Sequence, residues 1–274
     1  MTDVRKYLRE WAMPHVLCPG CAHGIVLKSF LEAVDQLQLD QDKVAMVAGI
    51  GCSSRLAGYA DLCTMHGTHG RAPAFATGLK LARPDLDVVV VSGDGDGLAI
   101  GGNHLIHAAR RNIDITVLLL NNSIYGMTGG QVAPTTPQGA IASTSPGGNS
   151  EASFDPCRLL TGAGASFVAR VLAATPIEMT KTIVEAMSHP GFAFIEIVGD
   201  CPEYFGRYNK AGGGAEMLNF IARQGESVAV PLTSKRFVNH VPTPEPRPGL
   251  RTGVLNREIR PVYSGVRRAV SDEA

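Results

Sequence analysis

The stretch from residue 87 to residue 122 constrains the fold more than any other part of the chain. Val88–Val91 is a short β-branched run, as expected for a strand that is buried on both faces of a parallel sheet. A glycine-rich turn follows at 93–97, and the apolar spacing from Leu98 to Arg111 is that of a helix. A second apolar run covers Ile115–Leu120. The pattern predicts an α/β fold with a mostly parallel sheet and helices on both faces.

The glycine turn after the first strand indicates a ligand site. Free N–H groups and the dipole at the start of a helix favour an anion such as a phosphate. A dinucleotide would require the spacing GxGxxG. Counted from Gly93, that spacing needs a glycine where the chain has Leu98, and counted from Gly95 it needs one where the chain has Ile100. The spacing therefore argues against a nicotinamide dehydrogenase.

Two oxygen-bearing side chains stand at the ends of the two predicted strands. Asp94 follows the first strand and Asn122 follows the second. Open α/β sheets bind their ligands at the carboxyl ends of strands. Mg²⁺ prefers hard oxygen ligands and takes only a few from the protein when phosphates supply others. Asp94 and Asn122 are therefore predicted to bind Mg²⁺ on a diphosphate.

The composition is that of a core-forming globular chain. Of its 274 residues, 45% are hydrophobic and 18% are charged, and the formal net charge is zero. Nothing in this balance indicates a nucleic-acid partner. No apolar run reaches the length of a membrane span, and the N-terminus has no apolar signal core, so we expect a cytoplasmic chain with no membrane contact. The lone tryptophan, Trp11, is expected to anchor an N-terminal arm by burial.

Six cysteines in a cytoplasmic chain indicate metal, cluster or redox roles, or plain burial, rather than structural disulfides. Cys18 and Cys21 form a CxxC pair, which alone suits a redox dithiol, half a zinc site or half an iron–sulfur site. Cys52 and Cys201 each follow a predicted strand. At one edge of a parallel sheet these four thiolates would suffice for one [4Fe–4S] cluster or one zinc ion, and their spacing does not choose between the two. The remaining two cysteines are expected to be buried: Cys63 and Cys157.

The motifs together resemble those of a known family. GDG, followed about 26 residues later by NN, resembles the signature of thiamine-diphosphate enzymes. The wider set, in its order and spacing between about residue 15 and residue 210, resembles the β subunit of 2-oxoacid:ferredoxin oxidoreductases. Ala22 departs from the family pattern, which often has a second glycine there, and affects no essential position. The motifs that carry the resemblance are CPGC with His-Gly following, GIGCSSR, HGTHGRA, GDGDGLAIGGNH, NNSIYGMTGGQ and DCPEYFGR.

The resemblance implies a set of cofactor ligands. It assigns Asp94, Asn122 and the main-chain carbonyl of Ile124 to Mg²⁺, with thiamine diphosphate bound beside the metal. It assigns one [4Fe–4S] cluster, close to the thiamine, to Cys18, Cys21, Cys52 and Cys201. The residues that it implies for the lining of the cofactor site are Ile50, Gly51, Cys52, Ser53, His66, His69, Gly95, Asp96, Gly126 and Met127.

The resemblance also implies a reaction and its partners. The reaction is oxidative decarboxylation of a 2-oxoacid to acyl-CoA and carbon dioxide, with electrons passed through the cluster to ferredoxin. The pyrimidine domain has no counterpart in this chain, which implies an α subunit that carries it. Arg55, just past Cys52, is predicted to pair with the distal carboxylate of 2-oxoglutarate. A structural salt bridge at the subunit interface is the competing interpretation of Arg55.

Other functions remain open from the residues. The same reaction on pyruvate or on a branched or aromatic 2-oxoacid needs no change in the motifs. A thiamine enzyme subunit without electron transfer would use Asp94 and Asn122 but has no use for four convergent cysteines. A zinc-stabilised binding module would use the cysteines and leave the GDG…NN pair without a role.

Three segments are predicted along the chain. Residues 1–17 form an N-terminal arm, and residues 18–210 form a domain that binds thiamine diphosphate, Mg²⁺ and the iron–sulfur cluster. Residues 211–274 are expected to be an extended C-terminal tail, because prolines alternate from Pro242 to Pro248 and no core periodicity is visible.

Overall fold

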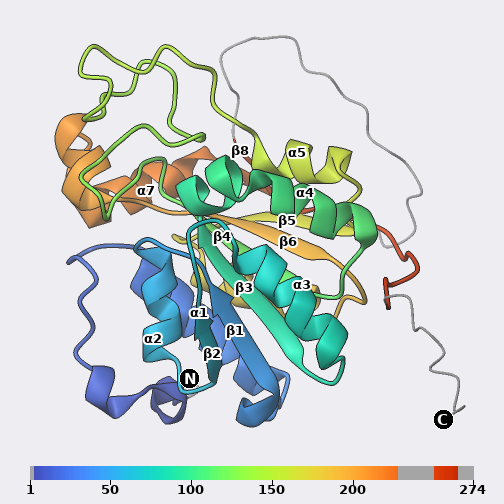
Figure 1. Ribbon diagram of the computed structural model, residues 1–274. Helices are drawn as coiled ribbons and strands as arrows, with labels where there is room; N and C mark the ends of the chain where they lie inside the picture. The colour runs from blue at the N-terminus through green and yellow to red at the C-terminus, as the bar shows by residue number, and fades with distance from the viewer. Residues whose placement is uncertain (1–2, 228–249, 265–274) are drawn as a thin grey trace, which may run out of the picture.

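The computed structural model describes residues 3–227 and 250–264 (Figure 1). An eight-stranded sheet lies at its centre, in the order β2-β1-β3-β4-β6-β5-β8-β7. The pairs from β2 to β5 along this order are parallel, whereas β8 runs antiparallel to β5. The strands are β1 (Val44–Ala48), β2 (Cys63–His66), β3 (Asp87–Gly93), β4 (Thr116–Asn121), β5 (Phe167–Leu172), β6 (Ala193–Val198), β7 (Gly225–Ser227) and β8 (Leu250–Arg257).

Helices cover both faces of the sheet (Figure 1). None of the helices within the described residues is long and apolar enough to span a membrane. The α-helices are α1 (His23–Gln36), α2 (Leu56–Tyr59), α3 (Ala72–Ala82), α4 (Gly102–Arg111), α5 (Pro156–Gly162), α6 (Pro176–Met187) and α7 (Gly214–Gln224). Shorter helical turns are η1 (Val4–Tyr7), η2 (Glu10–Ala12), η3 (Gln41–Lys43), η4 (Ser53–Arg55), η5 (Gly95–Ile100) and η6 (Pro202–Gly206).

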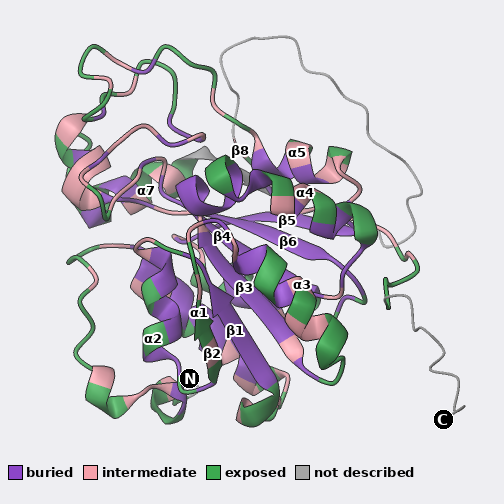
Figure 2. Cartoon of the chain, viewed as in Figure 1, coloured by how far each residue is buried: buried purple, intermediate pink, exposed green. Residues whose placement is uncertain are grey.

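Successive side chains of the central strands point to opposite faces, and each face has its own core. Val89 and Val91 of β3 pack in the cluster that contains the buried sides of α1 and α6. Val88 and Val90 pack in the cluster that contains α3, α4 and α5. Figure 2 shows the central strands buried on both sides. This is why the sequence of β3 reads as a continuous apolar run, and the predicted fold class is confirmed.

The carboxyl ends of four neighbouring strands lie at one edge of the sheet. Since β1, β3, β4 and β6 are adjacent and parallel, the segments that follow them emerge side by side. These segments begin at Gly49, Asp94, Asn122 and Gly199. The edge therefore gathers the residues that the motifs single out.

The N-terminal arm is anchored by a different aromatic residue from the one expected. Trp11 is 82% exposed, so the prediction that it is buried is wrong. Tyr7 is buried instead, and its hydroxyl donates a 3.0 Å hydrogen bond to Asp35 on α1. Tyr7 lies on η1 and Trp11 on η2, which has no buried residue.

The C-terminal part of the chain contributes to the sheet. Within the expected tail, Gly214–Gln224 is helical and Leu250–Arg257 adds strand β8 beside β5. The alternating prolines from Pro242 to Pro248 lie outside the described residues. The predicted limits of the arm, the domain and the tail stay predictions.

Asn112 ties the C-terminal segment to the sheet. It ends α4 in the left-handed conformation, with a φ of 53°, and is 1% exposed. Its side-chain oxygen, Oδ1, accepts hydrogen bonds from the Ser166 hydroxyl at 2.7 Å and from the Phe192 N–H at 2.9 Å. Its amide nitrogen donates to the carbonyls of Arg260 and Pro261. One side chain therefore satisfies polar groups from three segments.

We expect Asn112→Ala to lower the free energy of unfolding by about 3 kcal/mol, because buried groups lose their partners and alanine is strained at positive φ. Asn112→Gly loses the same hydrogen bonds without the strain, so it should be less destabilising by about 1 kcal/mol. Urea denaturation of both variants measures the two terms. A loss below about 0.5 kcal/mol in either variant would contradict this account.

Candidate active site at the carboxyl edge of the sheet

Asp94 is a buried carboxylate at the end of β3. It is 2% exposed, and Thr135 donates a 2.5 Å hydrogen bond to its Oδ2. Within residues 3–227 and 250–264 it forms no ion pair with a basic side chain. Burial raises the pKa of Asp94 to about 7, although the hydrogen bond from Thr135 acts to lower it. A buried carboxylate without a positive partner is the environment that a bound cation would stabilise.

The turn after β4 carries the second candidate oxygen ligand, Asn122. Asn121 and Asn122 are both 9% exposed. Asn121 Oδ1 accepts from the Ser123 N–H at 3.1 Å, and Asn122 Oδ1 accepts from the Ile124 N–H at 3.4 Å. Ser123 has a φ of 62°, which reverses the chain between Asn122 and Ile124. Side-chain hydrogen bonds of this kind are what hold asparagine turns.

Asp96 joins three glycine-rich loops at the same edge. Its Oδ1 accepts from the Ile50 N–H at 3.1 Å, the Gly70 N–H at 2.7 Å and His69 Nδ1 at 2.6 Å. Its Oδ2 accepts from the Ser92 hydroxyl at 2.5 Å. A side chain at Gly49 would place Cβ 2.1 Å from this carboxylate, so the strand end requires glycine. Asp96 is 3% exposed and acts as an organiser of the loops rather than as a free ligand.

Gly126 separates the Asn122 turn from two of the cysteines. A Cβ built at Gly126 would lie 3.4 Å from the sulfur of Cys52, 3.6 Å from the sulfur of Cys201 and 3.8 Å from the side-chain nitrogen of Asn122. Tyr125 closes the other side, with its hydroxyl donating to the Gly95 carbonyl at 3.0 Å. The Cβ position of Gly126 therefore lies within contact range of both the candidate metal ligand Asn122 and two of the cysteines.

The CxxC loop folds onto the segment that follows β6. Asp200 accepts a 2.9 Å hydrogen bond from the Ala22 N–H, which fixes the loop between Cys21 and α1. Burial raises the pKa of the Cys21 thiol to about 12, and the nearby Asp200 carboxylate and the Cys201 and Cys52 sulfurs add to the rise. The Cys18 sulfur also lies close enough to Cys52 and Cys201 to contribute to the raised pKa of each, so the four predicted cysteine ligands are brought together.

Two buried polar atoms beside the cysteines have no hydrogen-bond partner within the described residues. They are Oδ2 of Asp200 and the hydroxyl of Ser54. His23, at the start of α1, lies with its Nδ1 3.1 Å from the Cys21 sulfur, and burial lowers the pKa of this imidazole to about 4. Buried polar atoms without a partner are unusual in a folded protein, and the two here lie within two residues of the candidate ligands Cys52 and Cys201.

The other residues expected to line a cofactor lie along the rim of this edge. Ile50 and Met127 are large apolar side chains that are 40% and 45% exposed. His66 is exposed at the end of β2, and His69 is half-buried against Asp96. Arg55 is exposed beside Cys52. Burial raises the pKa of the Cys52 thiol, and the positive charge of Arg55 acts to lower it. Arg55 forms no ion pair in the described part of the chain. Ile50, Met127, His66 and Arg55 are thus accessible at this edge of the sheet.

Of the two leftover cysteines, one behaves as expected. Cys157 is buried on α5, whereas Cys63 is exposed on β2, so the expected burial of Cys63 is wrong. β2 is the outermost strand at its end of the sheet, which explains the exposure.

Sequence reasoning missed the residues that hold the motif residues in place. Thr135 reaches Asp94 from a long loop, and Thr136 donates to the Ser123 carbonyl at 2.6 Å. Glu196, in the middle of β6, accepts from Asn121 at 2.7 Å. A single charge within the apolar run AFIEIV was the available signal for Glu196. No spacing rule points to the two threonines.

Comparison with known proteins shows the family of the chain. The family model described as "Thiamine pyrophosphate enzyme, C-terminal TPP binding domain" matches residues 49–197. The 2-oxoglutarate synthase subunit KorB of Methanothermobacter thermautotrophicus is 54% identical over 79% of this chain and 76% of the relative. The corresponding KorB of Archaeoglobus fulgidus is 57% identical over 74% of this chain and 75% of the relative. The chain belongs to the family of 2-oxoacid:ferredoxin oxidoreductase β subunits, of the 2-oxoglutarate type.

A solved structure agrees with the family in its fold. It is a 2-oxoglutarate:ferredoxin oxidoreductase from Magnetococcus marinus with 2-oxoglutarate, coenzyme A and succinyl-CoA bound. It is 34% identical and superposes with a TM-score of 0.83 over 96% of this chain and 87% of that chain. The similarity therefore extends beyond residues 49–197, which the family model matches.

We expect Asp96→Ala to release the loops around Ile50 and Gly70, because it removes the shared acceptor of their N–H groups. Hydrogen exchange followed by mass spectrometry should show these loops exchanging at least about tenfold faster, while the core strands β3 and β4 stay protected. Asp96→Asn is the matched control, since its remaining oxygen still accepts from both N–H groups. Unchanged exchange of the two loops in Asp96→Ala would contradict the assigned role.

Proposed function

We propose that this chain is the β subunit of an enzyme that oxidatively decarboxylates 2-oxoglutarate to succinyl-CoA and carbon dioxide, with the electrons passed to ferredoxin. The observation that carries the proposal is the meeting of Asp94, the Asn122 turn and four cysteines at one edge of the sheet. A thiamine enzyme without electron transfer would leave the cysteines unused. The substrate is supported by the names of the relatives and by the ligands of the solved structure.

Mg²⁺ and thiamine diphosphate fit the strand-end pair. Asp94, the side-chain oxygen of Asn122 and the main-chain carbonyl of Ile124 would hold Mg²⁺ on the diphosphate. The buried, unpaired state of Asp94 supports a cation there. When bound, thiamine diphosphate supplies the carbanion chemistry that removes carbon dioxide, and a cluster supplies one-electron acceptance.

A [4Fe–4S] cluster fits the cysteines better than zinc does. Four zinc–sulfur bonds of about 2.3 Å bring all sulfurs within about 3.8 Å of one another. Among the described residues, no three of the sulfurs of Cys18, Cys21, Cys52 and Cys201 lie within 4.8 Å of one another. This spacing, wider than a single zinc ion requires, supports the proposal of a centre with several metal atoms.

The protein's own residues orient and enclose the reaction. The Asp96 carboxylate fixes the loops that carry Ile50 and His69 beside the cofactor. A Cβ at Gly126 would lie within van der Waals range of Cys52, Cys201 and Asn122, and this closeness of the candidate metal site to the cysteines would favour electron transfer between the two. The exposed apolar rim, with Ile50 and Met127, fits an α subunit that supplies the pyrimidine domain and completes the site. Coenzyme A and ferredoxin are the further partners, and the cytoplasmic location stays a prediction.

Arg55 is the proposed substrate residue. It is exposed at the rim, next to Cys52, and has no acidic partner within the described residues. A free guanidinium at this position suits a second carboxylate on the substrate, which 2-oxoglutarate has and pyruvate lacks.

The chain purified without exposure to oxygen should contain about four irons and four sulfides, with a reduced-cluster EPR signal after dithionite treatment. Cys52→Ser should lose most of this iron, whereas Cys63→Ser, which changes an exposed cysteine outside the group, should keep it. Zinc in place of iron would leave no electron path and would favour a non-redox thiamine subunit or a binding module.

In the complex with the α subunit, Arg55→Met should raise KM for 2-oxoglutarate by about tenfold or more, because one carboxylate loses its charged partner. KM for pyruvate should change little. Arg55→Lys retains the charge, so its KM for 2-oxoglutarate should lie between those of the wild type and Arg55→Met. Equal effects on both substrates would contradict the assigned role and would favour a structural salt bridge with the α subunit.

A further inference from the structure

A pair of opposite charges is buried inside the sheet. Arg170 on β5 and Glu196 on β6 are register partners, and Arg170 Nε donates to Glu196 Oε2 at 2.6 Å. The residues are 6% and 2% exposed. The rest of each strand, FVARVL and AFIEIV, is apolar. Burying such a pair gains little stability over apolar residues of similar size, so the pair calls for another reason.

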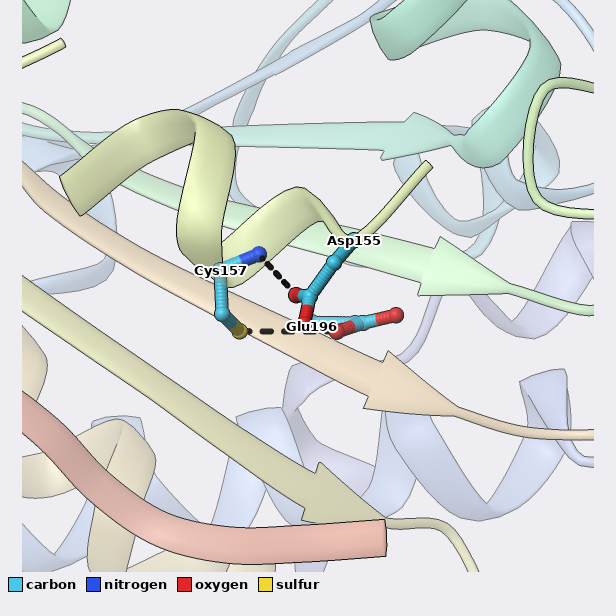
Figure 3. A group of neighbouring side chains, drawn as sticks. All are labelled: Asp155, Cys157 and Glu196. Carbon is cyan, nitrogen blue, oxygen red and sulfur yellow. Dashed lines mark hydrogen bonds between the residues drawn. The ribbon is translucent and has the colours of Figure 1, made fainter. Parts of the chain in front are cut away.

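The pair belongs to a larger group of side chains, and Figure 3 shows Glu196 with two of its other members, Asp155 and Cys157. Arg170 Nη2 also donates to Asp155 at 2.6 Å, and the Cys157 thiol donates to Glu196 Oε2 at 3.4 Å. Asp155, Cys157 and Glu196 have ligand atoms close enough together for a metal ion. Arg170, however, is hydrogen-bonded to both carboxylates and already supplies the positive charge between them. The group is therefore an ion-pair network rather than a second metal centre.

The network ends at the candidate metal site. The other oxygen of Glu196, Oε1, accepts from Asn121 Nδ2 at 2.7 Å. This contact forces the amide of Asn121 to direct its oxygen the other way, where it accepts from the Ser123 N–H at 3.1 Å. Ser123 is the left-handed residue between Asn122 and Ile124. Glu196 thus fixes, through Asn121, the turn that carries both of these ligands.

We propose that Glu196 is a positioning residue for the metal of the thiamine site, acting through the side chain of Asn121. Arg170 holds the carboxylate in place and balances its charge. The inference rests on the proposed function, since it assumes that the Asn122 turn binds Mg²⁺ with thiamine diphosphate. It assigns a role to the charges in β5 and β6 that packing alone does not explain.

Glu196→Gln is the most direct test, because it keeps the shape and changes one atom. In the wild type both carboxylate oxygens of Glu196 accept hydrogen bonds, whereas a glutamine side chain has only one oxygen. Arg170, as the charged donor, takes that oxygen, and the new NH₂ then faces Asn121. Asn121 must flip its amide to accept from it, which directs its own NH₂ at the Ser123 N–H and breaks the turn.

The measurement is a Mg²⁺ titration of thiamine diphosphate binding to the complex of the chain with its α subunit. Glu196→Gln should weaken Mg²⁺ by about 10- to 100-fold, as expected when a partner of a metal ligand is lost. Excess Mg²⁺ should restore binding. Cys157→Ala is the matched control: it removes another contact of Glu196 and leaves Asn121 untouched, so its Mg²⁺ affinity should stay within about threefold of wild type.

Asn121→Ala keeps the Arg170–Glu196 pair and provides a second test if Glu196→Gln folds poorly. It should weaken Mg²⁺ to a similar extent, and in the double variant the two losses should not add, because both break one link. Unchanged Mg²⁺ affinity in Asn121→Ala, or in folded Glu196→Gln, would overturn this inference while wild-type binding upholds the proposed function. Absence of Mg²⁺-dependent binding by the wild-type complex would overturn both.

Discussion

Parallel pairing of β1, β3, β4 and β6 is the constraint on which the rest of the structure depends. It buries these strands on both faces, so their sequences must be apolar, and it brings their carboxyl ends to one edge. The segments that leave this edge cannot continue the sheet and must find other hydrogen-bond partners. Asp96 supplies those partners for two of the loops, and Asn121 supplies one for the turn after β4. The polar residues of the site therefore satisfy backbone groups of the fold in addition to forming the candidate ligand site.

Two carboxylates with the same burial show how the structure separates these tasks. Asp94 and Glu196 are each 2% exposed. Glu196 has a cation within the protein, Arg170, and both of its oxygens accept hydrogen bonds from side chains. Asp94 has the hydroxyl of Thr135 on one oxygen and no cation in the described part of the chain. A charge that is already balanced serves to hold its neighbours, and a charge left unbalanced is available to a ligand.

The sequence predicts where the motif residues lie because their position after a strand is local. Asp94, the Asn122 turn and the cysteines after β1 and β6 could be placed at one edge once the strands were taken as parallel. The partners of these residues could not, because they depend on contacts between distant segments. Thr135 comes from a loop without periodicity, and the exposure of Trp11 depends on how the arm turns at η1 and η2. The strand order was also out of reach, since nothing local states which strands are neighbours.

The strand order decides how close the candidate metal site lies to the candidate cluster site. Chain order would place β5 beside β4, but β6 lies between them. This insertion sets Glu196 beside Asn121 and, at the end of the same strand, brings Cys201 to Gly126 and the Asn122 turn. With β5 in that place, the turn would lack its acceptor and the fourth cysteine would lie one strand further away, because neighbouring strands are about 4.8 Å apart. One choice of strand order therefore supports both the orientation of the candidate metal ligands and the closeness of the cysteines to them.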